Sequence, residues 1–453
     1  MKKTFALFFF LLSISSLFAQ NYYMSAPEGF GAAATGGGTP TVSNTVTVSN
    51  YTALKNALNS TAVSNSVILV SGTIVCDYTS VTLTNKTIIG LPGAVLINDQ
   101  ITLTNEATSV DKSGILNIKP GSNNVIIRNL VFKGPGAWDI GARDNLTNEG
   151  TNVWVDHCEF QDGMDGNFDN KGKADNVTIS WCKFTYLKTP IAEGSGGTDD
   201  HRFTDLVGSS KTDIPNDGNY SITFQNCYWA EGCKERMPRA RNAELHILNC
   251  YYKTSVVGSL AIGLGGGTNN TTCYVENSNF ETISKVYQTY SGDGGTIGVN
   301  FDGCVQGATS ASVNINSGTV SKPSYAYTKL NTSDVATYIT NASCGAGATL
   351  NITSSGVISA CNTLGVNDNA SNLELKFHPT VVDNILNIEF SSIENGLAVI
   401  EIFSVNGSKV YTSSKTVTGN EKVELNIAKL AKGVYICKVQ IENRVKTFKI
   451  VKN

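Results

Sequence analysis

Hydrophobic and polar positions in the middle of the chain repeat in nine-residue segments that align without gaps. The second and fourth positions are apolar and β-prone, as in Val153 and Val155, which is the alternation of a strand. The ninth position is always aromatic, and the sixth is Asn in four of the six segments. The segments are NVIIRNLVF from residue 124, NVWVDHCEF from 152, NVTISWCKF from 176, SITFQNCYW from 221, ELHILNCYY from 244 and TCYVENSNF from 272.

The apolar side of each segment switches between its fourth and seventh positions, which predicts a bend at positions five and six. Asn suits such a bend because it tolerates the left-handed backbone conformation and bonds its own chain. Strand, bend and strand at a period of about 25 residues are typical of one coil of a parallel β-helix. Coils stack at the strand spacing of ~4.8 Å, so equivalent residues should form ladders. One interval is 45 residues long, and we expect a degenerate coil near residues 198–206.

The seventh position of four segments is cysteine: Cys158, Cys182, Cys227 and Cys250. We interpret these side chains as buried small hydrophobes that stack on one another. Disulfides between neighbouring coils are the alternative, and the spacing alone does not exclude them. The chain has eleven cysteines, an odd number that cannot all pair within one chain. Pairing of the others is open, with Cys344–Cys361 as one candidate.

The two ends of the chain differ from this repeat. Residues 1–19 carry two lysines, an apolar run and small residues ending at Ala19, which is the pattern of a secretory signal peptide. No other apolar stretch approaches ~20 residues, so we expect no membrane span. Residues 349–371 are rich in Ser, Asn, Gly and Thr and suit a linker. Residues 372–453 alternate again in short strands and predict a small β-sandwich. The predicted chain is therefore all-β, with a parallel β-helix over residues 20–348.

A formal net charge of −3 argues against bulk electrostatic capture of nucleic acid, so any attraction to an acidic partner must be local. The stretch DGMDGNFDN, residues 162–170, holds three carboxylates and no Lys or Arg. Asp144 lies eight residues before the coil at residue 152, and Asp169 lies seven before the coil at 176. We therefore expect Asp144 and Asp169 to stack on consecutive coils, roughly 5 Å apart.

Several carboxylates gathered at one height suit Ca²⁺, which takes six to eight oxygen ligands. We expect Asp144, Asp165 and Asp169 to be the ligands, with Asp162 as a weaker fourth. A solvated acidic loop is the alternative, but the phase agreement and the basic residues on the following coils favour a site. Those basic residues are Lys188, Arg236, Arg239 and Arg241. The histidines are scattered, and His157 and His246 are interpreted as structural.

Taken together, NVWVDHCEF, DGMDGNFD and RMPRAR (236–241) resemble the polysaccharide lyase family 1 pectate lyases. The similarity extends over most of residues 27–348 and includes PEGFGAAATGG, NKTIIGLPGAVL (85–96) and SCGAGA (343–348). It implies a right-handed parallel β-helix, here expected to be a monomer, that cleaves polygalacturonate by β-elimination with Ca²⁺. It matches Asp144, Asp165 and Asp169 to calcium-binding acids. It also matches Arg236 to the catalytic base and Lys188 and Arg241 to substrate-binding residues, and we group Arg239 with the latter.

The chemistry that this resemblance implies fits the residue types. Elimination removes the C5 proton of a uronate, and Ca²⁺ would neutralise the carboxylate charge that opposes this step. A guanidinium base conflicts with the rule that Arg stays protonated. Lys234, Arg239, Arg241 and bound Ca²⁺ would disfavour the charged form of Arg236, so we expect an alkaline pH optimum.

Three other functions were weighed against this one. A pectin lyase acting on methyl-esterified chains would rely on Arg without the acid cluster. A hydrolase on the same fold would use paired acids without Arg236. A non-catalytic surface adhesin would keep the coil but would not need Arg236.

The last 82 residues resemble the C-terminal sorting domain of type IX secretion cargo. The resemblance is carried by VNGSKVY, LAKGVYICKV and the basic tail KTFKIVKN, although the usual YPNP opening is here FHPT (377–380). It implies export through the periplasm to the cell surface or medium, with this domain cut off and uninvolved in catalysis. A carbohydrate-binding or adhesive module is the alternative.

Overall fold

The structure is a computed structural model and describes residues 24–101, 112–360, 375–391, 395–405, 407–441 and 444–453. The predicted signal peptide, residues 1–19, lies outside the described residues. The chain forms two compact units that divide between residues 361 and 362. Within the described ranges, no helix is long and apolar enough to cross a membrane.

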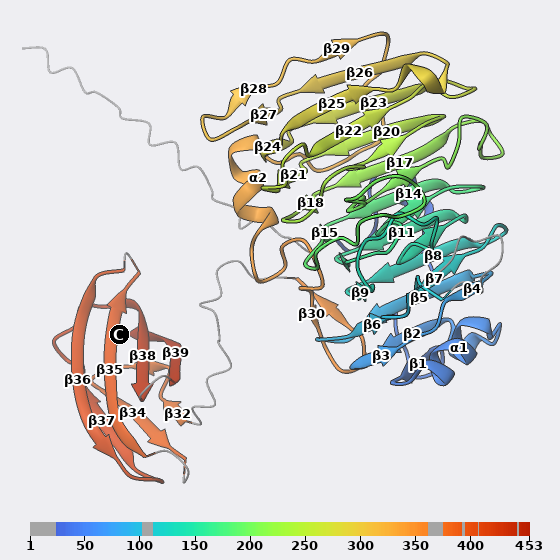
Figure 1. Ribbon diagram of the computed structural model, residues 1–453. Coiled ribbons are helices and arrows are strands. Elements are labelled where there is room, and N and C mark those ends of the chain that lie inside the picture. Colours follow the sequence, from blue (N-terminus) through green and yellow to red (C-terminus); the bar gives the residue numbers. More distant parts are fainter. Residues whose placement is uncertain (1–23, 102–111, 361–374, 392–394, 406, 442–443) are drawn as a thin grey trace, which may run out of the picture. The chain divides into compact units, whose positions relative to one another are not determined.

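Three sheets, here named A, B and C, form the sides of the coiled first unit. Nearly all of their strand pairs are parallel (Figure 1). Sheet A contains β1 (Thr45–Val48), β2 (Val67–Val70), β5 (Thr84–Gly90), β8 (Asn123–Arg128), β11 (Thr151–Asp156), β14 (Asp175–Ser180), β17 (Tyr220–Gln225), β20 (Ala243–Leu248), β23 (Thr271–Glu276), β26 (Ile297–Asp302) and β29 (Asn316–Ser317). Sheet B contains β3 (Thr73–Val75), β6 (Val95–Ile97), β9 (Val131–Lys133), β12 (Glu159–Gln161), β15 (Lys183–Thr185), β18 (Tyr228–Trp229), β21 (Tyr251–Lys253), β24 (Asn279–Thr282), β27 (Val305–Gln306) and β28 (Ala311–Ser312). Sheet C contains β4 (Thr79–Val81), β7 (Leu116–Ile118), β10 (Leu146–Asn148), β13 (Phe168–Asn170), β16 (Leu206–Val207), β19 (Arg239–Ala240), β22 (Leu260–Leu264) and β25 (Lys285–Thr289).

Each coil runs from sheet A through sheet B to sheet C and then to sheet A of the next coil. The predicted parallel β-helix is therefore confirmed, and it is right-handed. The nine-residue segment corresponds to the sheet A strand, a bend and the sheet B strand that follows. Its second and fourth side chains point into the core, where the side chains of Val153 and Val155 are completely buried.

The predicted bend lies at position six of every segment. Each of these residues has a positive φ, between 46° and 58°, which most L-residues avoid. Asn adopts this region more easily than other non-glycine residues because its short polar side chain can bond nearby backbone. The residues are Asn129, His157, Trp181, Asn226, Asn249 and Asn277.

Both predicted ladders are present in the core. The aromatic rings of position nine stack with centroid separations of 4.3 to 5.5 Å: Phe132, Phe160, Phe184, Trp229, Tyr252 and Phe280. The position-seven cysteines, Cys158, Cys182, Cys227 and Cys250, are completely buried free thiols, as interpreted from the sequence. Cys344 takes part in a disulfide, and its candidate partner Cys361 lies outside the described residues.

The prediction of a degenerate coil near residues 198–206 is wrong. Strand β14 pairs directly with β17, and β15 pairs directly with β18, so the 45-residue interval is a single coil. The additional residues form a long connection between β15 and β16, residues 186–205, and a second loop between β16 and β17. A skipped coil and an enlarged loop give the same spacing in the sequence.

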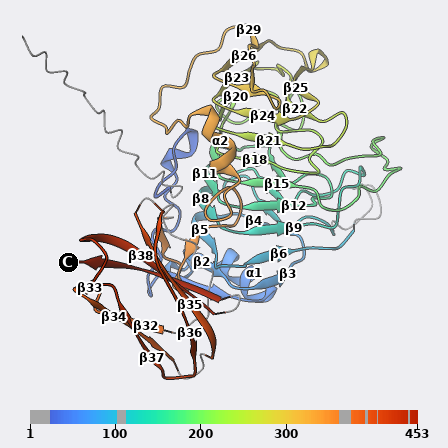
Figure 2. The ribbon, with the colours of Figure 1, turned by 90° about the vertical axis from the view of Figure 1, so that its left-hand side faces the viewer.

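Helices and short segments cover the ends and flanks of the coil. Helix α1 (Tyr51–Asn59) packs Leu54 and Leu58 against the first strands, and the 3₁₀ turns η1 (Phe30–Ala33), η2 (Val63–Asn65) and η3 (Ser291–Asp293) lie in connections. Helix α2 (Thr332–Ile339) lies along β21 and β24 (Figures 1 and 2). The hairpin β30 (Asn351–Ile352) and β31 (Ile358–Ser359) packs on sheet A, against an apolar cluster separate from the interior of the coil that includes Val67, Leu69 and Ile89. Residues 351–359, predicted as linker, are therefore part of the first unit.

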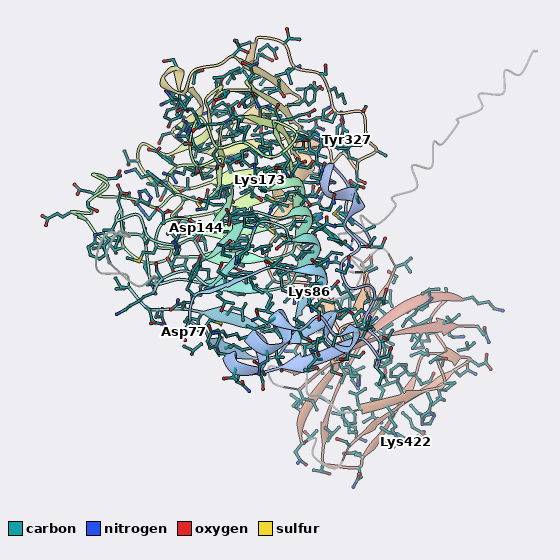
Figure 3. All side chains as sticks on the ribbon, turned by 90° about the vertical axis from the view of Figure 1, so that its right-hand side faces the viewer. Asp77, Lys86, Asp144, Lys173, Tyr327 and Lys422 are labelled. Carbon is teal, nitrogen blue, oxygen red and sulfur yellow. The ribbon has the colours of Figure 1, made fainter. Side chains whose placement is uncertain are left out.

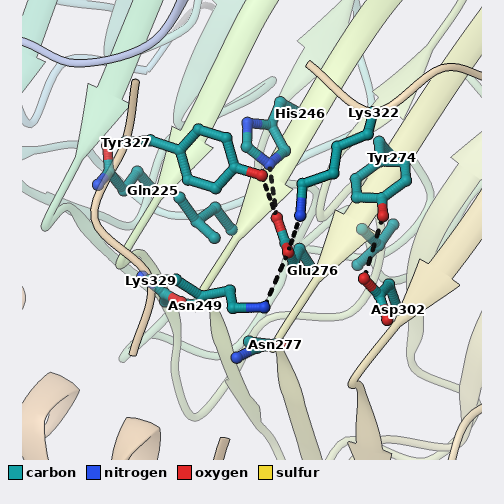
Figure 4. A network of polar contacts seen from close by, with 12 residues as sticks. Gln225, His246, Asn249, Tyr274, Glu276, Asn277, Asp302, Lys322, Tyr327 and Lys329 are labelled. Carbon is teal, nitrogen blue, oxygen red and sulfur yellow. Dashed lines mark hydrogen bonds and ion pairs between the residues drawn. The ribbon is translucent and has the colours of Figure 1, made fainter. Parts of the chain in front are cut away.

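A buried carboxylate fastens the segment before α2 to sheet A (Figure 4). Glu276, at the end of β23, is fully buried and accepts hydrogen bonds from Lys322 Nζ (2.7 Å), Tyr327 Oη (2.6 Å) and Lys329 Nζ (3.2 Å). His246 Nε2 lies 3.7 Å from the same carboxylate. Burial alone would raise the pKa of Glu276, but these donors hold it below its ordinary value.

The second unit consists of two mainly antiparallel sheets with alternating buried and exposed positions, as a β-sandwich requires. Its buried core includes Leu386, Ile400 and Val439. One sheet contains β32 (Leu375–His378), β34 (Ile385–Phe390) and β37 (Lys422–Asn426). The other contains β33 (Val381–Val382), β35 (Gly396–Ser404), β36 (Lys409–Val417), β38 (Gly433–Ile441) and β39 (Arg444–Lys452).

Candidate active site

The candidate site residues all follow a sheet B strand, in the connections that lead into sheet C or within sheet C itself. Asp144 precedes β10, Asp165 precedes β13, and Asp169 is the central residue of β13. Lys188 follows β15, and Arg236 follows β18, while Arg239 and Arg241 lie in or just after β19. Successive coils therefore bring one side of the β-helix together around these side chains.

Asp144 and Asp169 approach each other, but not in the predicted register. Asp169 pairs with Thr147 across the ladder, because the connection after β13 (171–174) is two residues longer than the one after β10 (149–150). The prediction that the two acids occupy equivalent positions is therefore wrong. Their carboxylates nevertheless converge beside Gly166: a Cβ placed there would lie 2.9 Å from Asp144 Oδ1 and 3.0 Å from Asp169 Oδ1. Asp144 is labelled in Figure 3.

A lysine that sequence reasoning did not select balances this pair. Lys171 Nζ lies 3.0 Å from Asp144 Oδ2 and 3.7 Å from Asp169 Oδ2. Burial and the neighbouring Asp144 carboxylate raise the pKa of Asp169 well above its ordinary value. Burial would lower the pKa of Lys171, but Asp144 and Asp169 raise it instead. The pair therefore needs a cation close to it.

Asp165, the third predicted ligand, faces a histidine. His201 Nε2 donates to Asp165 Oδ1 over 3.1 Å, since an ionised carboxylate only accepts. Burial would raise the pKa of Asp165, but this hydrogen bond and the charge of Arg236 lower it. The Asp165 side chain remains 24% exposed, and among the described residues its second oxygen has no hydrogen-bond partner.

The residues present fit a hard divalent cation, although no three His, Cys, Asp or Glu side chains in the described ranges are already gathered around one point. Asp144 is 1% exposed, and its Oδ1 has no hydrogen-bond partner within those ranges. A buried carboxylate oxygen without a partner is costly, so it marks a place where a cation would stabilise the fold. Asp144, Asp169 and Asp165 supply only oxygen donors, which Ca²⁺ prefers.

Asp162, considered as a fourth ligand, also makes a positional contact. Its Oδ1 accepts hydrogen bonds from the backbone N–H groups of Leu187 (2.7 Å) and Lys188 (2.8 Å). It therefore fixes the start of the long 186–205 connection and the direction of Lys188. The Lys188 ammonium donates to Gly134 O (3.0 Å) and lies 3.1 Å from Asp99 Oδ1.

The guanidinium of Arg236 lies close enough to the acids to act on their charges but forms no ion pair with them. Its φ of 59° is unusual for a residue with a side chain, and such conformations gather at functional sites. The guanidinium lies 4.7 Å from the centroid of the Phe203 ring. In the described part of the chain it has no hydrogen-bond or ion-pair partner, yet its charge acts on Asp165 and Asp169. It lines a pocket of about 340 Å³.

The two remaining arginines line the same pocket but share a carboxylate. Asp293 forms an ion pair with Arg239 and lies 3.0 Å from Arg241 Nε. Arg239 also stacks on the ring of Tyr290, 3.8 Å from its centroid, and burial lowers its pKa. The cationic neighbours expected around Arg236 are therefore partly compensated.

Residues 9–349 match a family model described as pectate lyase, which covers more than half of the chain. The chain belongs to the pectate lyase family. Residues 376–453 match a secretion system C-terminal sorting domain. Both resemblances expected from the sequence are thus confirmed.

Two curated relatives within the pectate lyase family are named pectate trisaccharide-lyase, from Thermotoga sp. (strain RQ2) and Thermotoga maritima. Each is 33% identical over 214 residues, which cover 44% of this chain and 50% of the relative. The chain therefore spans about half the length of these relatives. The solved pectate lyase pelN of Paenibacillus sp. 0602 has a TM-score of 0.55 and 19% identity, covering 71% of this chain and 96% of that one. This structural likeness supports the β-helix fold.

Sequence reasoning about this pectate lyase family member missed four residues that shape the site. Lys171 carried a usable signal, since it lies two residues after Asp169 and would share its face if the alternation of β13 (Phe168–Asn170) continued by one residue. Asp139, His201 and Asp293 carried none, because each reaches the site from a connection of irregular conformation.

Proposed function

We propose that the chain is a secreted Ca²⁺-dependent pectate lyase that cleaves α-1,4-linked polygalacturonate by β-elimination and leaves 4,5-unsaturated oligogalacturonides. Family membership supports the reaction class. One observation supports the calcium-dependent chemistry: two buried carboxylate oxygens, of Asp144 and Asp169, converge beside Gly166 within reach of the charge of Arg236.

Each candidate residue has a role in this proposal. Asp144, Asp165 and Asp169 would hold Ca²⁺, which supplies charge neutralisation at a uronate carboxylate. Lys188 and Arg241 bind neighbouring uronate carboxylates, Arg241 with its planar fork of donors. Arg239, which lines the same pocket, would bind substrate beside them while it packs on Tyr290 and pairs with Asp293.

Arg236 is the base. Its guanidinium has no hydrogen-bond or ion-pair partner among the described residues, so it can approach the C5 proton of a bound uronate. Transfer of that proton to Arg236 lets the C4–O4 bond break and the C4–C5 double bond form, while solvent protonates the departing oxygen. An arginine side chain accepts a proton only when it is in its neutral form, so activity should rise toward alkaline pH.

Export is the second part of the proposal. The match of residues 376–453 to a sorting domain supports secretion through the type IX machinery, by way of the periplasm, to the cell surface or medium. The sandwich would then be removed, and the β-helix unit, residues 20–361, would act as the mature catalytic region.

An assay with polygalacturonate tests the proposed reaction directly. The unsaturated product absorbs ultraviolet light, and we expect it to appear with Ca²⁺ and to vanish with a chelator. Arg236→Lys should lower kcat by about 10²–10⁴-fold, in line with loss of a positioned base. Arg202→Lys is the matched control, since Arg202 pairs with Asp200 and has no proposed role. New reducing ends without ultraviolet absorbance, or full activity in Arg236→Lys, would overturn the proposal.

A further inference from the structure

The end of the long 186–205 connection passes directly behind the candidate site. His201 is 4% exposed and lies between two carboxylates. Its Nε2 is 3.1 Å from Asp165 Oδ1, and its Nδ1 is 3.2 Å from Asp139 Oδ1, although the second contact is not aligned as a hydrogen bond. A ring held in this way bonds one oxygen of Asp165 and does not occupy the other. Groups that bond a metal-binding side chain from behind fix its orientation.

Phe203, two residues further, contacts the proposed base. Its ring packs against His201 with a centroid separation of 4.1 Å, and the guanidinium of Arg236 lies over the Phe203 ring at 4.7 Å. A cation over an aromatic face is attracted by the ring quadrupole. The contact gives Arg236 a defined place without an anion that would hold its proton.

The backbone ties these two contacts into one unit. Phe203 forms a parallel bridge with Glu235, Thr204 N donates to Glu235 O (3.1 Å), and Asp205 N donates to Arg236 O (2.7 Å). Residues 201–205 therefore run alongside residues 235–236 while His201 reaches back to Asp165. One short segment therefore contacts both the proposed calcium ligand Asp165 and the proposed base Arg236.

We propose that His201 and Phe203 are a positioning pair, in which His201 orients Asp165 for calcium and Phe203 holds the guanidinium of Arg236 over the substrate. The inference rests on the proposed function, because it assigns tasks to that calcium site and that base. Neither side chain reacts: His201 acts through Asp165, and Phe203 acts through Arg236. The pair therefore predicts two separable defects.

Calorimetric Ca²⁺ titration of the intact protein, without substrate, tests the proposed role of His201. His201→Leu removes the donor and should weaken calcium binding about 10–100-fold. His201→Gln keeps an N–H donor and should remain within about threefold of the wild type. If His201→Leu lacks the wild-type melting transition, His201→Asn, which is too short to reach Asp165, takes its place. His157→Gln is the matched control, because it disturbs an equally buried histidine on Asp156 that lies at the bend between sheets A and B.

Steady-state kinetics at saturating calcium and substrate test the proposed role of Phe203. Phe203→Leu should leave calcium affinity unchanged and lower kcat about tenfold, because a small displacement of a reacting group is costly. Phe203→Tyr keeps the ring and should restore kcat.

The outcomes separate this inference from the proposed function. A wild-type protein that binds no calcium would overturn both. If the wild type binds calcium and a folded His201→Leu variant binds it with the same affinity, only the proposed role of His201 is overturned. Equal kcat in Phe203→Leu would overturn the Phe203 arm, and a purely structural role predicts both of these results.

Discussion

At the scale of single residues, the calcium proposal depends on the absence of a side chain at Gly166. The two carboxylate oxygens that converge beside Gly166 leave no room for a side chain, since a Cβ would lie within 3.0 Å of both. Both obstructing atoms are the ends of Asp side chains, which can turn aside at little cost to the fold. A methyl group at this position would therefore separate the ligands without unfolding the coil.

Gly166→Ala should accordingly weaken Ca²⁺ binding about tenfold or more while the melting temperature changes little. Calorimetric titration and a thermal scan of the same sample measure both quantities. Gly292→Ala is the matched control, because a Cβ there meets no atom within 4 Å. Unchanged calcium affinity in Gly166→Ala would place the ion elsewhere.

His246 is a second residue with a measurable consequence, this time for stability. It is fully buried beside Glu276, with Nδ1 2.7 Å from Tyr325 Oη and with Lys322 and Tyr327 nearby. Burial lowers the pKa of His246 from 6.5 to about 4. The unfolded chain therefore takes up a proton before the folded chain does as pH falls. The stability linked to this histidine is complete above about pH 6.5 and is lost progressively down to about pH 4.

The wild type should thus lose about 2 kcal/mol more unfolding free energy between pH 7 and pH 5 than His246→Gln, which cannot titrate. Urea unfolding followed by tryptophan fluorescence measures this, because all four tryptophans lie in the β-helix unit. Parallel pH profiles of the two proteins would refute the buried neutral histidine.

At the scale of elements, the aromatic ladder is the feature that holds successive coils in register. Phe160 is fully buried and stacks on Phe132 at 5.0 Å and on Phe184 at 5.4 Å. Truncation removes contacts on both sides and leaves a cavity that neighbouring coils cannot fill. Phe160→Ala should therefore cost about 3–5 kcal/mol in unfolding free energy. Gln161→Ala, on the outer face of the same strand, should stay within about 0.5 kcal/mol. A loss below 1 kcal/mol at residue 160 would contradict the ladder's role.

The elements could be predicted from the sequence wherever burial enforces a period. Positions two, four, seven and nine of each segment face the interior, so their residue types repeat, and the sixth residue must adopt a left-handed bend. The connections obey no such constraint. The 45-residue interval could not be divided between a coil and a loop, and two additional residues at 171–174 shifted the register of Asp169.

The same distinction applies to the candidate site. Asp144, Asp165 and Asp169 could be selected because the coil period brings their segments together. His201 and Asp139 could not, because their approach depends on the path of irregular connections. The backbone acceptor role of Asp162 at residues 187–188 could not be predicted either, because it depends on a contact between neighbouring coils.

At the scale of the whole molecule, the two compact units have separate hydrophobic cores, and we propose separate tasks for them. Every residue proposed for binding or catalysis lies between residues 139 and 293, inside the β-helix. The sandwich supplies none of them. Its proposed role ends with export, so the catalytic unit should not need it in order to fold or to act.

A chain ending at Ser371, which retains Cys361, should therefore keep kcat/KM on polygalacturonate within about twofold of the full chain. The tryptophan-detected unfolding transition should also be unchanged, since all four tryptophans report on the β-helix. Secretion from the producing cell should be lost, because the sorting domain is absent. A full-length chain carrying Phe160→Ala provides the opposite pattern, with lowered stability and an intact sorting domain. Loss of activity in the folded, shortened chain would mean that the sandwich contributes to the site, and the division of tasks would then be wrong.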